Sequence, residues 1–106
     1  MKTFEIEILK KLVKGSVVES DSSLINPVLC NSQYTGVGYF LTIRLDNPVS
    51  DRIILDAPHI SGYLGSTLVG YLAFAENSEL TLECHSYGDE EVSEKSRHNG
   101  FVINET

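Results

Sequence analysis

Residues 68–87 read LVGYLAFAENSELTLECHSY, which is the clearest structural pattern in the sequence. It predicts two strands, residues 68–76 and 79–87, joined by Asn77 and Ser78. Asparagine tolerates the positive φ angle that a two-residue hairpin turn needs, so the strands should pair antiparallel. Because side chains alternate between the two faces of a strand, the second run should have one buried and one exposed face. The expected faces are Leu80, Leu82, Cys84 and Ser86 on one side, and Thr81, Glu83, His85 and Tyr87 on the other.

Further strands are expected on both sides of this hairpin. Residues 39–45 alternate Tyr39, Leu41, Ile43 and Leu45 with polar or aromatic side chains, which is typical of a strand. Residues 52–57 predict a short strand, after which Pro58 and two glycines break the chain into turns or a bulged segment. A short strand is expected at residues 16–19, and residues 24–30 could be an edge strand or an irregular crossing. A charged loop is expected over residues 88–100, and residues 101–103 could close the fold as a last short edge strand.

The first segment fits two patterns. Phe4, Ile6 and Ile8 alternate as in a strand, whereas an apolar stripe from Phe4 to Val13 has helical spacing. We favour a helix over residues 4–14, because lysines and a following Gly15 suit a helix C-terminus. The expected fold class is mainly β (α+β): an antiparallel sheet or small β-sandwich with one short N-terminal helix, as a single domain over residues 1–106. The predicted core includes Leu41, Ile43, Leu72, Phe74, Leu80 and Leu82.

The negative charge is concentrated in one part of the chain. The formal net charge is −7, and residues 1–52 sum to zero. No lysine or arginine occurs between Arg52 and Lys95, and the acids there are Asp56, Glu76, Glu79, Glu83, Asp89, Glu90, Glu91 and Glu94. Such a segment repels the phosphates of nucleic acids but attracts a basic protein. The alternative is a solvated acidic surface that only aids solubility.

Motifs for catalysis or metal binding are weak. The glycines of TGVGYF (residues 35–40) enter a predicted strand without a Gly-Lys-Ser/Thr ending, so they do not form a phosphate-binding loop. Cys84 and His85 should point to opposite faces of one strand, which disfavours a shared metal ion. We therefore expect no enzyme activity, no metal and no cofactor. Cys30 and Cys84 are expected to be buried free thiols, with a disulfide between them as the open alternative.

Tyrosines beside acidic residues are better candidates for a functional site, namely a site that binds a partner. Tyr87 precedes a run of acids, and Tyr63 and Tyr71 lie in the same acidic segment. Tyrosine packs a large area against a partner, while carboxylates receive arginine and lysine. The alternative for each tyrosine is a ring at the edge of the core with its hydroxyl in water.

Two stretches resemble a known group of proteins. TGVGYF (35–40), followed by LVGYLAFAENSELTLECHSYGDEEV (68–92), resembles small bacterial proteins that include immunity proteins of toxin systems, among them contact-dependent growth inhibition. This resemblance covers about a third of the chain. It implies that the chain binds and neutralises a cognate toxin, and no functional residues transfer with it.

The sequence thus predicts an immunity protein that covers the basic surface of a toxin, with a nuclease as the expected target. The alternatives are a binding or structural module with another partner, and a small enzyme. Residues 1–15 mix acids and lysines without the apolar core of a signal peptide, so we expect a cytoplasmic protein with no membrane or small-molecule partner. The predicted partner-binding residues are Glu83, Tyr87, Asp89, Glu90, Glu91 and Glu94.

Overall fold

The hairpin predicted from residues 68–87 is present as β4 (Thr67–Glu76) and β5 (Glu79–Ser86). The strands pair antiparallel from Val69 opposite Ser86 to Glu76 opposite Glu79, and Asn77 in the turn has a φ of 54°. The computed structural model describes residues 1–88 and 91–105, with side chains for all of these except residues 94 and 98–105. The turn chemistry read from the sequence is confirmed.

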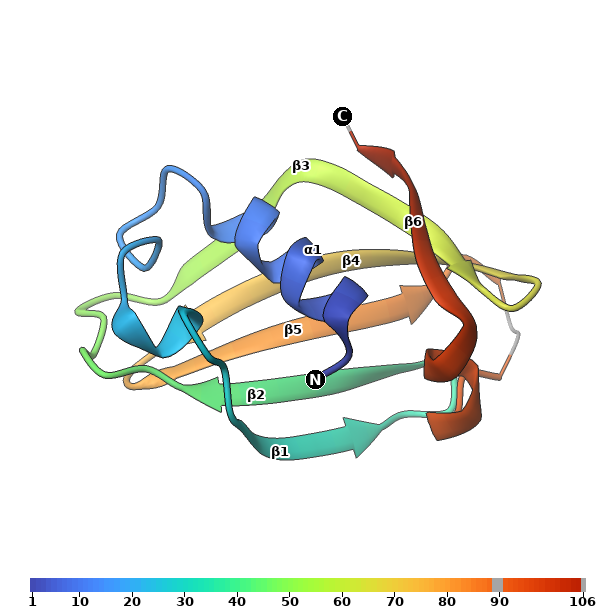
Figure 1. The fold of residues 1–106 in the computed structure, drawn as a ribbon, viewed down its shortest axis with the longest axis horizontal. Coiled ribbons are helices and arrows are strands. Elements are labelled where there is room, and N and C mark those ends of the chain that lie inside the picture. The colour runs from blue at the N-terminus through green and yellow to red at the C-terminus, as the bar shows by residue number, and fades with distance from the viewer. Residues whose placement is uncertain (89–90, 106) are drawn as a thin grey trace.

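The hairpin lies inside a six-stranded antiparallel sheet (Figure 1). Its strand order is β1-β2-β5-β4-β3-β6, so β1 and β6 form the edges. The remaining elements are α1 (Thr3–Val13), a 3₁₀ helix η1 (Ser22–Leu24), β1 (Leu29–Tyr34), β2 (Gly38–Arg44), β3 (Ile53–Leu64), a 3₁₀ helix η2 (Glu94–Asn99) and β6 (Gly100–Glu105). The predicted class, a mainly β fold with an antiparallel sheet and one short N-terminal helix, is confirmed.

The helix α1 packs obliquely across one face of this sheet (Figure 1). Its apolar stripe, Ile8, Leu9, Leu12 and Val13, is buried there. Gly15 follows with a φ of 81°, the left-handed conformation that commonly ends a helix. The helix predicted for this segment is therefore confirmed, and the alternative of a strand is wrong.

The sheet buries one set of alternating side chains beneath α1. Leu41, Ile43, Leu80 and Leu82 are each at most 1% exposed, as predicted. Leu72 and Phe74 are only half-buried, because β4 turns these side chains away from α1. Its inward residues include Ala73 and Ala75, whose small size suits the close approach of a helix to the sheet. The expected burial of Leu72 and Phe74 is wrong.

Several predicted boundaries also differ. Residues 16–19 form turns instead of a strand, and the first edge strand begins at Leu29 instead of residue 24. β3 continues through Pro58 to Leu64, and its pairing with β4 shifts register between Leu55 and Ile60. Proline has no N–H to donate, and it lies within this irregularity, where regular ladder bonds are interrupted. The predicted loop after Gly88 contains η2.

The glycines of TGVGYF lead the chain into β2. Gly36 has a φ of 94°, and its backbone pairs with Val92 in an isolated bridge. A Cβ atom at Gly38 would lie 2.0 Å from the backbone oxygen of Cys84. Both glycines are thus required by the backbone geometry of this strand entry.

Candidate functional site

The second face of the sheet has no helix packed on it in residues 1–88 and 91–105. Leu24 of η1 is part of the core cluster that includes the buried residues of α1, and Arg97 of η2 donates a hydrogen bond to Glu5 of α1, so both lie on the side occupied by α1. We call the outward side chains of β2, β4 and β5 the open face. Its central members are Phe40, Thr42, Leu72, Phe74, Thr81, Glu83 and His85. Arg44, Glu76 and Glu79 continue it toward the hairpin turn, and Leu68 and Tyr87 continue it toward the other end.

Glu83 lies in the middle of the open face. It is directly opposite Phe40 on β2 and Leu72 on β4, so an acidic side chain stands between two apolar neighbours. Its side chain is 29% exposed, and its one ionic neighbour in the described structure is His85, whose Nδ1 atom lies 3.9 Å from Glu83 Oε2. Phe40 also contacts Phe74 edge to face, with ring centroids 6.4 Å apart. This arrangement gives a partly aromatic surface with a carboxylate at its centre.

One end of the open face is acidic but internally paired. The guanidinium carbon of Arg52 lies 5.0 Å from the ring centroid of Phe74, and its Nε is 3.7 Å from Glu76 Oε2. Glu79 is the register partner of both Glu76 and Arg44. The acids at the hairpin turn therefore have arginines nearby, which the charge distribution along the sequence did not indicate.

Tyr87 lies at the other end of the open face, together with two histidines. Its hydroxyl is 3.2 Å from His59 Nε2, and its ring contacts His85 edge to face at 5.4 Å. A Cβ atom on Gly70 would lie 2.4 Å from this hydroxyl, so the glycine leaves the space into which Tyr87 folds. The Nδ1 atom of His85 is buried and has no hydrogen-bond partner among the described residues.

The structure brings some of the predicted site residues together. Glu83 and Tyr87 share the open face, and Glu91 is exposed beside Val92, which pairs with Gly36 at the Tyr87 end of the sheet. Asp89 and Glu90, and the side chain of Glu94, lie outside the described residues. The binding role of all six stays a prediction.

The other two tyrosines of the acidic segment are less accessible. Tyr71 is 4% exposed and points into the core beneath α1, so it is not a surface anchor. Tyr63 is half-buried on β3. Tyr87, at 49% exposed, is the most accessible of the three tyrosines.

A buried ionic cluster was missed from the sequence. Glu5 is fully buried and accepts hydrogen bonds from Arg97 Nε at 2.8 Å, Arg97 Nη2 at 2.7 Å and the Tyr39 hydroxyl at 2.7 Å. Arg97 also donates from Nη1 to the Tyr34 hydroxyl at 2.9 Å. The hydrogen bonds with Glu5 raise the pKa of Arg97, and burial raises the pKa of Tyr39 far above its usual value. The only sequence signal was a glutamate on the first turn of the predicted helix.

The two cysteines lie in different surroundings. Cys84 is buried, and burial raises the pKa of its thiol to about 12, so it stays protonated at neutral pH and is a poor nucleophile. Cys30 is exposed on the edge strand β1, which corrects the expectation that both are buried. Both are free thiols, and β2 separates their strands, so the disulfide alternative is wrong.

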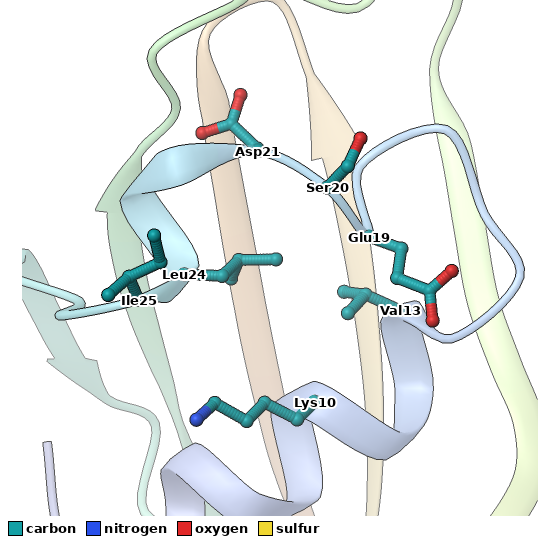
Figure 2. A pocket seen from close by; sticks show the side chains of 7 residues that line it. All are labelled: Lys10, Val13, Glu19, Ser20, Asp21, Leu24 and Ile25. Atoms are coloured by element: carbon teal, nitrogen blue, oxygen red, sulfur yellow. The ribbon is translucent and has the colours of Figure 1, made fainter.

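A pocket of about 470 Å³ lies between the end of α1 and η1 (Figure 2). Lys10, Val13, Glu19, Leu24 and Ile25 are among the residues that line it, with Val13 and Glu19 on one side and Leu24 and Ile25 on the other. The carboxylate of Asp21 points away from its centre and accepts four hydrogen bonds, from the Ser23 hydroxyl and from the backbone N–H groups of Ser23, Asp46 and Asn47. Burial alone would raise the pKa of Asp21, but these bonds lower it to about 2. Asp21 therefore ties the loop after α1 to the turn after β2.

Two other kinds of site are absent from the described residues. These residues contain no group of three or more His, Cys, Asp or Glu side chains placed to hold a metal ion. They also contain no helix whose length and apolar character would let it cross a membrane. Comparison of the chain with protein families, curated proteins and solved structures finds no match.

Proposed function

We propose that the protein works by binding a protein partner through its open face, without catalysing a reaction. The observation that carries this proposal is Glu83, a half-buried carboxylate between Phe40 and Leu72 on a sheet face without a covering helix. Aromatic anchors beside a desolvated charged group are the features that dominate binding energy at protein interfaces. Tyr87 extends this surface at one end.

The partner that fits this surface is a basic toxin domain. The net charge of −7 attracts a positively charged protein and speeds its association. A toxin that cuts RNA or DNA holds phosphates on a basic surface, and an acidic inhibitor can occupy that surface. Together with the resemblance of residues 35–40 and 68–92 to immunity proteins, this supports neutralisation of a cognate toxin in the cytoplasm.

The buried polar groups support binding over catalysis. Glu5 and Arg97 are hydrogen-bonded to each other and to two tyrosines, so their bonding capacity is used within the fold. The thiol of Cys84 is protonated and enclosed. These groups are suited to holding α1 and η2 against the sheet.

Co-expression with a toxin tests this proposal. The toxin domain expected beside the gene for this chain is produced in bacteria with wild-type protein, with Glu83→Gln, or with Glu19→Gln as a matched control on the α1 side. Wild type and Glu19→Gln should rescue growth, and Glu83→Gln should rescue less at equal protein level. Absence of rescue by wild type would contradict the immunity function. Rescue that is equal for all three would contradict the open face as the binding surface.

A further inference from the structure

The open face already holds one arginine side chain of the chain itself. The guanidinium group of Arg52 lies 5.0 Å from the ring centroid of Phe74 and beside the carboxylate of Glu76. A planar guanidinium can stack on an aromatic ring and donate to a carboxylate with the same group. This pair of neighbours, one phenylalanine and one glutamate, defines an arginine-binding arrangement on this sheet.

A second phenylalanine and glutamate are neighbours on the same face, across two adjacent strands, whereas Phe74 and Glu76 are two positions apart on β4. Phe40 and Glu83 are direct register partners on β2 and β5, so their side chains are neighbours on the same face. Phe40 contacts Phe74, which places this second pair beside the one that Arg52 occupies. Among the described ion pairs, Glu83 has only His85, at 3.9 Å.

We propose that Phe40 and Glu83 bind the side chain of an arginine presented by the protein partner. This inference rests on the proposed function and specifies the chemistry of that same surface. The guanidinium lies over the Phe40 ring and donates two hydrogen bonds to the Glu83 carboxylate, with Leu72 against its other edge. Because Glu83 is already largely withdrawn from water, docking completes its desolvation, and a two-pronged arginine contact satisfies both oxygens.

Arginine fits this position better than lysine. An ammonium group is compact and strongly hydrated, and it cannot stack as a plane on a ring while it donates in parallel to both carboxylate oxygens. The surface should therefore discriminate between two basic peptides of equal charge. Charge attraction alone would not discriminate between two peptides of equal charge.

The test uses hexa-arginine and hexa-lysine peptides as probes. Each is titrated into protein with labelled phenylalanine rings and leucine methyl groups, and affinity and shifted residues are read by NMR. Wild type should bind hexa-arginine about two- to fivefold more tightly than hexa-lysine, with the largest shifts at Phe40 and Leu72. Glu83→Gln and Phe40→Leu should each abolish this preference, whereas Glu91→Gln should lower both affinities equally. Signal dispersion in the same spectra verifies that each variant is folded.

Two results would overturn the inference: equal affinity of wild type for both peptides, or a preference that survives in Glu83→Gln. These outcomes are separable from failure of the proposed function. Loss of the arginine preference with Glu83-dependent toxin rescue would leave protein binding by the open face intact. An arginine preference without toxin rescue would retain the arginine site and reject the immunity role.

Discussion

Glu5 of α1 and Arg97 of η2 are 92 positions apart in the sequence and form a two-pronged salt bridge, with N–O distances of 2.7 and 2.8 Å. Glu5 is fully buried and Arg97 is 8% exposed. This salt bridge joins α1, near the N-terminus, to η2, near the C-terminus. It lies on the side of the sheet opposite the open face, so its effect should be on stability and not on the binding surface itself.

The salt bridge should be sensitive to removal of one partner. Glu5→Gln should lower the free energy of unfolding by about 3–5 kcal/mol, because it leaves the guanidinium of Arg97 buried without its counter-charge. Urea unfolding followed by circular dichroism measures this. The exposed pair Arg52 and Glu76 is the matched control, and Glu76→Gln should cost less than about 1 kcal/mol. Equal costs for the two variants would contradict a buried ion pair.

Gly38 should not tolerate a side chain. Gly38→Ala places a Cβ atom against the backbone oxygen of Cys84, so β2 and β5 must separate locally. We expect a loss of about 1–3 kcal/mol in the free energy of unfolding, measured by thermal or urea denaturation. Gly88→Ala is the control, because a Cβ atom there meets nothing within 4 Å. A Gly38→Ala protein as stable as Gly88→Ala would show that the strand entry is wrongly placed.

Asp21 should make stability depend on acid pH. Its folded-state pKa of about 2 is below the ordinary 3.8, so the unfolded state binds the proton more readily. The stabilisation is fully present above pH 3.8 and is lost as the pH falls toward 2, with a total of up to about 2 kcal/mol. Unfolding free energies of wild type and Asp21→Asn, measured from neutral pH downward, should converge over this range. A constant difference between the two unfolding free energies would disagree with the hydrogen bonds assigned to Asp21. Asp51→Asn, at an exposed site, serves as the control.

Two leucines distinguish the faces of the sheet. Leu82→Ala should cost about 2–5 kcal/mol, because Leu82 is fully buried beneath α1. Leu72→Ala, on the half-buried open face, should cost clearly less. The same denaturation measurement applied to both variants checks this order. The reverse order would mean that α1 covers the other face.

Local patterns in the sequence predicted much of the sheet. The alternation in residues 79–87 and the Asn77 turn identified the central hairpin, and Gly15 marked the helix end. Each of these features depends only on residues that are close together in the sequence. The inward face of β4 was harder to predict, because Ala73 and Ala75 are less apolar than Leu72 and Phe74, and only the proximity of the helix explains the choice.

The candidate site was predictable only in part. Alternation alone placed Glu83 and Tyr87 on the same exposed face. Nothing local could show that Phe40 on β2 lies opposite Glu83, or that Arg52 stacks on Phe74, since both contacts depend on strand order. The Glu5–Arg97 pair, formed by residues near the two ends of the chain, is beyond any local pattern for the same reason.

A binding titration tests the central claim most directly. Wild type, Glu83→Gln and Glu19→Gln are titrated with the toxin domain by calorimetry at about 0.01 and 0.15 M salt. We expect Glu83→Gln to lose about 2 kcal/mol or more of binding free energy at both salt concentrations, because a carboxylate desolvated at the interface is little screened. Glu19→Gln should change affinity slightly, and only at low salt. Equal affinities of Glu83→Gln and wild type at both salt concentrations would contradict binding through the open face.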